Sequence, residues 1–374
     1  MRVDHPAPFR DVGPIRTKVI FALLVALFFG ISNLTTSQAT TPKTSLQYVS
    51  ILGNQIIDQN GKSVRLLGVN KSGSEYACAQ GWGIFDGPFD LPAVLAMKSW
   101  GINAVRIPLN SACWLSRSSV ANSKFTGAVY RSAIIDVVKL LQSQGMVAIL
   151  DLHANPPRNG NSVKTTVAAP NQDAIVFWKS VAVNFKLHKN VLFDLFNEPQ
   201  GVDWNCWRNG CLAKNGTTYI GMQNLTDAIR LTGSKSPIIV EGRNTSTDFS
   251  GWTNYKVIDP LSQLILSNHN YQGMTGNNTL ESWNKNYLPI TQEMPFLTGE
   301  LGQPDCKSDY VNKYMDWADS NGVSYLGWTW NVENKYWPCI GKHSLIKDSE
   351  GTPTGHGIGF KNHFLANIQR MDEK

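Results

Sequence analysis

Two glutamates stand at the ends of strongly apolar segments of the sequence. Glu198 follows the run "VLFDLF" directly after Asn197, and Glu300 ends the segment "PFLTGE". Burying such polar groups in a packed core is costly, so we expect them where a strand leaves the core and enters a cleft. Two carboxyls that face each other suit glycosidic bond cleavage. One protonates the departing oxygen while the other attacks or shields the anomeric carbon.

Short apolar and β-branched runs, ended by Gly, Pro, Asn or a polar cluster, recur through the chain. They cover residues 65–70, 103–108, 146–153, 190–198, 237–242, 263–271, 295–300 and 324–330. Helix-like patterns separate these runs, as in residues 130–145, where Ile134, Val137, Val138 and Leu141 share one face. Strands that alternate with helices in this way predict a single α/β domain, a (β/α)₈ TIM barrel. A doubly wound open sheet is the alternative, but no glycine-rich phosphate loop follows the first strand.

Catalytic groups of such a barrel gather at the carboxyl ends of its strands. The predicted strand ends carry the polar or aromatic residues Arg106, Asp151, His153, Asn197, Glu198, His269, Tyr271, Glu300, Trp328 and Trp330. Asp151 is either a hydrogen-bonding support or a spectator. Glu241, which ends the fifth strand, is expected to have at most a supporting role, because the fourth and seventh strands hold the matched pair.

The first 39 residues have the features of a secretory signal peptide. Basic residues precede an apolar run over 19–31, and Ser37 and Ala39 suit a cleavage site. We therefore expect a secreted, extracellular protein whose mature catalytic domain covers 40–374. An uncleaved membrane anchor is the alternative, although the run is shorter than the roughly 20 residues of a membrane span. No later run approaches that length, and no basic block indicates a nucleic-acid partner.

The six cysteines are an even number in a chain expected to be exported, which predicts disulfides. None stands in a paired C-x-x-C pattern, so we expect no zinc site. All six fall in predicted loops at the catalytic rim. Pairing neighbours would give Cys78–Cys113, Cys206–Cys211 and Cys306–Cys339, which is one of several possible connectivities.

The whole predicted mature chain resembles glycoside hydrolase family 5, the cellulase and mannanase family. The matching residues are Asn197-Glu198-Pro199, Glu300 in "FLTGELG", Arg106 in "VRIPL", His153 in "DLHAN", His269 with Tyr271, and Trp330. The resemblance implies a retaining mechanism without cofactor or metal, with Glu300 as nucleophile and Glu198 as acid and base. It also implies that Arg106 and Tyr271 hold Glu300, and that His153, Asn197, His269 and Trp330 bind substrate or support catalysis.

The resemblance implies a β-linked polysaccharide or oligosaccharide as substrate. We expect a monomer, because the sequence shows no amphipathic heptad pattern or long exposed edge strand. We predict an endo-β-1,4-glucanase, because loop tryptophans are abundant and this activity is common in the family. The alternatives are a β-mannanase, an exo-β-glucanase or a glycosidase of small β-glycosides, and the long loop over 71–90 would either line a groove or close one end. A metal-dependent hydrolase would need a ligand pair that the first strand lacks. A non-catalytic carbohydrate-binding barrel would be expected to have lost one glutamate.

Overall fold

The computed structural model describes residues 45–117, 123–156, 167–214, 216–274, 276, 278–336 and 338–372. The signal peptide predicted over 1–39 lies outside these residues. Within them, no helix combines the length and the apolar character that crossing a membrane requires.

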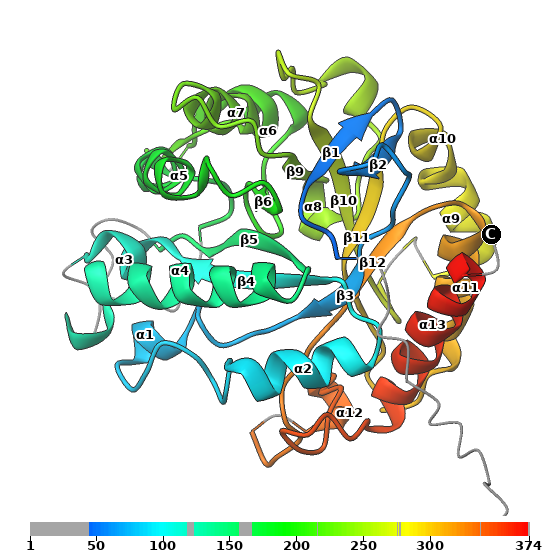
Figure 1. The fold of residues 1–374 in the computed structure, drawn as a ribbon. Coiled ribbons are helices and arrows are strands. Elements are labelled where there is room, and N and C mark those ends of the chain that lie inside the picture. Colours follow the sequence, from blue (N-terminus) through cyan, green and yellow to red (C-terminus); the bar gives the residue numbers. More distant parts are fainter. Residues whose placement is uncertain are drawn as a thin grey trace, which may run out of the picture. The chain divides into compact units, whose positions relative to one another are not determined.

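Eight parallel strands close into a barrel at the centre of the described chain (Figure 1). They are β3 (Leu67–Asn70), β4 (Ala104–Asn110), β5 (Val147–Ala154), β6 (Val191–Asp194), β9 (Ile238–Glu241), β10 (Leu264–Tyr271), β11 (Phe296–Gly302) and β12 (Ser324–Gly327). The last strand, β12, pairs with the first, β3, and this contact closes the ring. The predicted (β/α)₈ barrel is confirmed, and the open doubly wound sheet is wrong.

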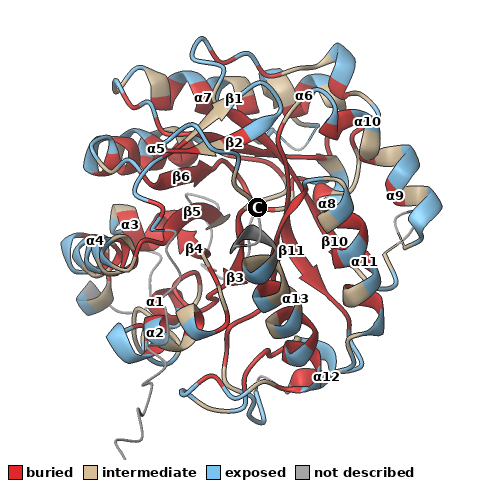
Figure 2. Cartoon of the chain, turned by 45° about the vertical axis from the view of Figure 1, so that its right-hand side comes forward, coloured by how far each residue is buried: buried red, intermediate tan, exposed pale blue. Residues whose placement is uncertain are grey.

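Helices surround the barrel and present their buried faces to it (Figure 2). They are α1 (Ala77–Gln80), α2 (Leu91–Ser99), α3 (Ser111–Leu115), α4 (Ala128–Ser143), α5 (Gln172–Phe185), α6 (Trp204–Asn209), α7 (Met222–Arg230), α8 (Arg243–Ser246), α9 (Leu280–Asn286), α10 (Leu288–Thr291), α11 (Asp309–Ser320), α12 (Cys339–Lys342) and α13 (Gly355–Asp372), with 3₁₀ turns η1 (Ser123–Phe125) and η2 (Trp252–Asn254). The face predicted for α4 is buried, from Ile134 to Leu141.

The barrel interior is filled by one apolar layer to which every strand segment contributes. Its members are Leu66, Ala104, Val147, Ile149, Leu192, Ile239, Ile265, Leu297 and Leu326. Three more members, Leu46, Val49 and Ile56, come from a hairpin of β1 (Val49–Leu52) and β2 (Gln55–Asp58) and the residues before it. This hairpin, which the sequence analysis missed, covers the amino end of the barrel. The Leu46 and Val49 amides donate to carbonyls just before β5 and β6.

Three disulfides fasten loops at the opposite, carboxyl end of the strands. They join Cys78 to Cys113, Cys206 to Cys211 and Cys306 to Cys339, so the predicted pairing of neighbours is confirmed. The second lies next to a small antiparallel pair, β7 (Cys211–Leu212) and β8 (Thr218–Tyr219). The long loops that frame the barrel mouth are thus cross-linked.

Candidate active site

Side chains alternate between the two faces of each strand, and this alternation places apolar residues in the barrel interior. It also places polar side chains there, above the apolar layer. Two residues beyond an interior apolar position lie Arg106 on β4, Asp151 on β5, Asp194 on β6 and Glu241 on β9. Because side chains on a strand alternate between its two faces, these four point into the barrel as well. All four are fully buried. Asp194 was missed from the sequence, although its spacing from the interior Leu192 indicates its direction.

Glu300 reaches the interior through an irregularity in β11. The pairing of β10 with β11 shifts, so that Asn268 opposes Thr298 while the next residue, His269, opposes Glu300. The additional residue is Gly299, and such a bulge redirects the side chains that follow it. A Cβ at Gly299 would stand 2.8 Å from Ser267 Oγ, which is too close. The bulge therefore turns the Glu300 carboxylate into the barrel mouth.

Arg106 is the centre of the buried polar cluster. Its Nε donates to Asp194 at 2.8 Å, its Nη1 to Glu300 at 2.8 Å and its Nη2 to Glu241 at 2.9 Å. The remaining contacts of the guanidinium are Asn70 Oδ1 at 3.1 Å, Asn197 Oδ1 at 2.9 Å and Asp151 Oδ2 at 3.0 Å. A planar fork with several fixed donors suits such a site, because it orients all its partners at once.

Burial and charge divide the four carboxyls around Arg106 into two kinds. Burial raises the pKa of Asp151, and burial together with Glu241 raises that of Asp194. Burial alone would raise the pKa of Glu241 too, but His269 and Arg106 outweigh it and lower the pKa to about 2. In Glu300, burial is likewise outweighed, by His269, Arg106 and His153, and its pKa is lowered. His269 and Arg106 therefore favour the ionised forms of Glu241 and Glu300.

Glu198 is held at the edge of this cluster and faces outward. Its backbone has a positive φ of 51°, a conformation uncommon outside glycine, and its amide donates to Glu241 Oε2 at 2.7 Å. The hydroxyl of Ser246 donates to the same Glu241 oxygen. The Glu198 side chain is 30% exposed, and its Oε1 lies 3.0 Å from His269 Nδ1. Glu241, expected to be at most a support, thus anchors the backbone of Glu198.

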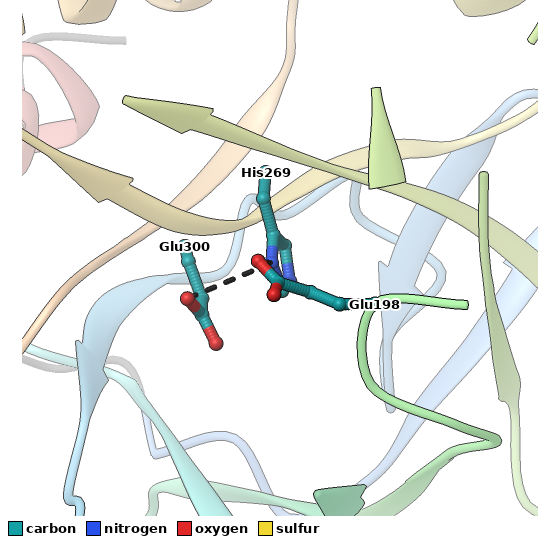
Figure 3. A group of neighbouring side chains, drawn as sticks. All are labelled: Glu198, His269 and Glu300. Atoms are coloured by element: carbon teal, nitrogen blue, oxygen red, sulfur yellow. Dashed lines mark hydrogen bonds and ion pairs between the residues drawn. The ribbon is translucent and has the colours of Figure 1, made fainter. Parts of the chain in front are cut away.

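The two glutamates picked out in the sequence come together at the barrel mouth. Figure 3 shows both carboxyls next to His269, whose Nδ1 lies 3.0 Å from Glu198 Oε1 and 3.5 Å from Glu300 Oε2. One oxygen of Glu198 and one of Glu300 lie within 4.8 Å of each other. Tyr271 donates its hydroxyl to Glu300 Oε2 at 2.6 Å, and Asn197 accepts from Arg106. The structure therefore brings Arg106, Asn197, Glu198, His269, Tyr271 and Glu300 into one cluster.

A family model, cellulase (glycosyl hydrolase family 5), matches residues 57–334. The chain belongs to glycosyl hydrolase family 5. Curated relatives include an endoglucanase of Clostridium saccharobutylicum, 24% identical over 83% of this chain and 63% of the relative, and endoglucanase 5 of Pectobacterium carotovorum subsp. carotovorum, 23% identical over 82% and 55%. The chain thus spans about three fifths of the length of these relatives.

Solved structures show the same fold at low sequence identity. The β-glucanase of Saccharophagus degradans has a TM-score of 0.64 and 20% identity, over 86% of this chain and 94% of that one. A hyperthermophilic endocellulase of Pyrococcus horikoshii has a TM-score of 0.64 and 19% identity, over 87% and 99%. These likenesses support the barrel assignment of the family 5 chain.

Trp330 does not lie where a sugar-binding tryptophan was expected. It is 2% exposed and packs edge-on against Trp100, with ring centroids 4.8 Å apart. Two residues earlier, Trp328 is half-buried and stacks on His153, with ring centroids 5.7 Å apart and planes inclined by 15°. The buried position of Trp330 therefore does not suit the substrate binding expected of it, and of these two tryptophans Trp328 is the more exposed.

The other loop tryptophans differ in their exposure. Trp114, Trp207 and Trp252 are buried, Trp204 is half-buried, Trp82 is 49% exposed, and Trp337 lies outside the described residues. Of the tryptophans that the structure describes, Trp82 is the most exposed. Loop position alone does not separate an indole that covers the core from one that is open to solvent.

Metal-ligand geometry occurs twice among the described residues of this family 5 site. Glu198, His269 and Glu300 form one group of ligand-type atoms within 4.8 Å, and a second consists of Asp151, Asp194 and Glu241. In the second group the Arg106 guanidinium contacts all three carboxylates and supplies the positive charge that they require. In the first, the Glu300 oxygens already accept from Arg106 and Tyr271.

His153 gives this family 5 site a testable pH dependence. Burial lowers the pKa of its imidazole, but the carboxylate of Asp151, at 2.8 Å, outweighs burial and raises the pKa to about 9. Because this pKa is raised in the folded state, the protonated imidazole stabilises the fold. The contribution is at most roughly 3 kcal/mol and is fully present below about pH 6.5, the ordinary pKa of histidine. This contribution is lost as the pH rises through about 9.

We expect the free energy of unfolding of the wild type to be higher than that of a His153→Asn variant. The difference should be largest near pH 6. The difference should narrow toward pH 10, because the imidazole then loses its charge in the folded state as well. Urea unfolding of both proteins at several pH values measures it. A difference that stays constant with pH would show that the His153–Asp151 pair carries no net charge stabilisation.

Proposed function

We propose that this chain is a secreted, retaining endo-β-1,4-glucanase. The observation that carries the proposal is the separation of the two glutamates, whose nearest carboxylate oxygens lie within 4.8 Å. Retaining enzymes hold their carboxyls roughly 5–5.5 Å apart, whereas inverting enzymes leave roughly 6.5–9.5 Å for a water molecule. The spacing favours a direct attack by one carboxylate on the sugar.

In the proposed first step, Glu300 attacks the anomeric carbon while Glu198 gives its proton to the glycosidic oxygen. The lowered pKa of Glu300 keeps it ionised, and the donors from Arg106 and Tyr271 fix both of its oxygens. Glu198 is the more exposed of the two carboxyls, which suits contact with a departing sugar. The leaving part of the chain departs as an alcohol, and the remaining sugar is bonded to Glu300 as an ester.

In the second step, water takes the place of the departed sugar. Glu198, now a carboxylate, removes a proton from this water, which attacks the anomeric carbon and releases Glu300. Two inversions give a product with the configuration of the substrate. The charges of Glu241 and Glu300 raise the pKa of His269 well above its ordinary value, although burial opposes them. Its protonated Nδ1 lies 3.0 Å from Glu198 Oε1 and donates a hydrogen bond to that oxygen in both steps.

The preference for β-1,4-glucan rests on the names of the relatives. Several are endoglucanases, and one solved β-glucanase with this fold was crystallised with cellotetraose. The predicted signal peptide and the three disulfides support secretion, because disulfides persist in oxidising compartments.

The test is hydrolysis of carboxymethylcellulose, galactomannan and laminarin by the purified chain, with Glu300→Gln as the blank. We expect a rapid loss of viscosity on carboxymethylcellulose, and NMR should detect the β-anomer of the product first. If galactomannan were the preferred substrate, the proposed glucanase activity would be wrong and the chain would be a mannanase. Slow release of small sugars without loss of viscosity would replace endo by exo action, and an α-anomer formed first would overturn the retaining mechanism.

A further inference from the structure

The loop that follows β9 contacts the segment that carries Glu198 at successive points. The Glu198 amide donates to Glu241 Oε2 at 2.7 Å, and the carbonyl of the following residue, Pro199, accepts from the Thr245 amide at 3.2 Å. Both hydrogen bonds involve the main chain of the segment, so they fix its course. The φ of 51° at Glu198 sets the direction in which the side chain leaves this main chain.

Arg243 extends the contact along the same segment. Its Nη1 donates to the Val202 carbonyl at 2.5 Å, and its guanidinium carbon lies 5.3 Å from the ring centroid of Trp204, within the range of a cation–π contact. Asp248 holds the guanidinium from the other side, with Oδ2 at 2.8 Å from Nη2. The loop after β9 therefore holds the chain from Glu198 to Trp204.

Three consecutive residues of this loop have a left-handed backbone. The φ angle is 51° at Asn244, 55° at Thr245 and 62° at Ser246. A residue with a side chain adopts this conformation at an energetic cost, which is larger for a β-branched residue such as Thr245. Such a backbone persists where surrounding contacts fix it, and it is common at functional sites. One contact that fixes it here is the Ser246 hydroxyl, which donates to Glu241 Oε2.

Ser246 is fully buried and supplies the second donor to the carboxylate oxygen that holds Glu198. The other oxygen of Glu241, Oε1, accepts from Arg106 Nη2 at 2.9 Å and lies 3.3 Å from His269 Nε2. Cations therefore attract this carboxylate from one side, and the Ser246 hydroxyl and the Glu198 amide hold it on the other. Without the hydroxyl, we expect the carboxylate to turn toward the cations and away from the Glu198 amide.

We propose that Ser246 is a positioning residue for acid catalysis by Glu198. The proposal rests on the proposed function. Ser246 acts through Glu241, which fixes the Glu198 amide and so keeps the acid within hydrogen-bond distance of the glycosidic oxygen. Proton transfer requires this distance, so a small displacement of the acid slows the steps that need a proton. The attack by Glu300, which is held by other donors, should be unchanged.

The leaving group separates these two effects. A 2,4-dinitrophenolate departs without a proton, whereas a phenolate needs one in the transition state. We therefore compare phenyl and 2,4-dinitrophenyl β-cellobioside by kcat/KM, which reports the first step even where the second limits kcat. In Ser246→Ala we expect a loss of about tenfold on the phenyl glycoside, a part of the roughly 10²–10⁴-fold that a general acid contributes. The loss on the dinitrophenyl glycoside should stay within about twofold.

Two further variants separate positioning from stability. Ser246→Gly removes the same hydroxyl but suits a left-handed backbone, so it should unfold at an equal or higher urea concentration than Ser246→Ala. Its kcat/KM should nevertheless show the same dependence on the leaving group. Thr253→Ala removes an exposed hydroxyl farther along the same loop and is the matched control. It should behave as the wild type on both glycosides.

Equal slowing of Ser246→Ala and Ser246→Gly on both glycosides, or no slowing on the phenyl glycoside, would overturn the role of Ser246 and leave the glucanase standing. An effect in Ser246→Ala that is absent from Ser246→Gly would also overturn it, because backbone strain would then be the cause. A wild type that cleaves neither glycoside nor carboxymethylcellulose would overturn the proposed function and the role of Ser246 together.

Discussion

Replacing Glu300 by glutamine should lower kcat by about 10⁵-fold or more, the scale seen when a covalent nucleophile is removed. The amide keeps the shape of the side chain but cannot form the glycosyl ester. It also leaves Arg106 and Tyr271 without the anionic oxygens that they contact at 2.8 and 2.6 Å. The measurement is kcat on an aryl β-cellobioside, with thermal unfolding of both proteins to show that the variant is folded.

A small anion distinguishes the roles of the two glutamates. In Glu300→Gly, azide takes the place of the missing carboxylate and should give an α-glycosyl azide in one inversion. In Glu198→Ala, Glu300 still forms the ester with a good leaving group, and azide then attacks it to give the β-glycosyl azide. The same anomer from both variants, or rescue of neither, would contradict the assignment of nucleophile and acid/base.

Most of the site was predicted from the strand ends and from the family resemblance, and the barrel geometry explains why these side chains meet. Residues two apart on a strand share a face, so an interior Ala104 implies an interior Arg106, and Ile149 implies Asp151. The same reasoning, applied to Leu192, would have found Asp194. What spacing does not contain is tertiary contact. The hydrogen bond from the Glu198 amide to Glu241, for example, joins the end of β9 to a residue 43 positions earlier in the chain.

Irregular backbone marks the places where prediction from the sequence was incomplete. Strict alternation on β11 puts Glu300 on the outer face with Thr298, and only the extra residue Gly299 turns it inward. Two tryptophans that are two residues apart follow β12, and the sequence alone did not separate the buried Trp330 from the half-buried Trp328. The amino-terminal hairpin lies before the first barrel strand, outside the alternation of strands and helices that predicted the barrel.

Replacing Arg106 by methionine should lower the free energy of unfolding by about 3–5 kcal/mol at neutral pH, the usual effect of removing one member of a buried ionic group. The side chain is fully buried and contacts four carboxyls, so its loss leaves Glu241 and Glu300 with less positive charge nearby. Activity should fall as well, because Glu300 loses the donor that aligns it. Urea unfolding midpoints and kcat on an aryl β-cellobioside measure the two effects.

The pH dependence of the Arg106→Met deficit separates charge balance from packing. The folded-state pKa values of Glu241 and Glu300 are lowered partly by Arg106, so the stability that they contribute is present above about pH 4.5 and is lost as the pH falls through the folded-state values. The deficit of the variant should therefore be largest near pH 7 and should shrink below about pH 4.5. Arg106→Lys, which keeps the charge but not the planar fork of donors, should be less destabilised and should show a weaker pH dependence. If the variant lost the same free energy of unfolding near pH 7 and below pH 4.5, Arg106 would stabilise the barrel mouth by filling space rather than by neutralising its carboxylates.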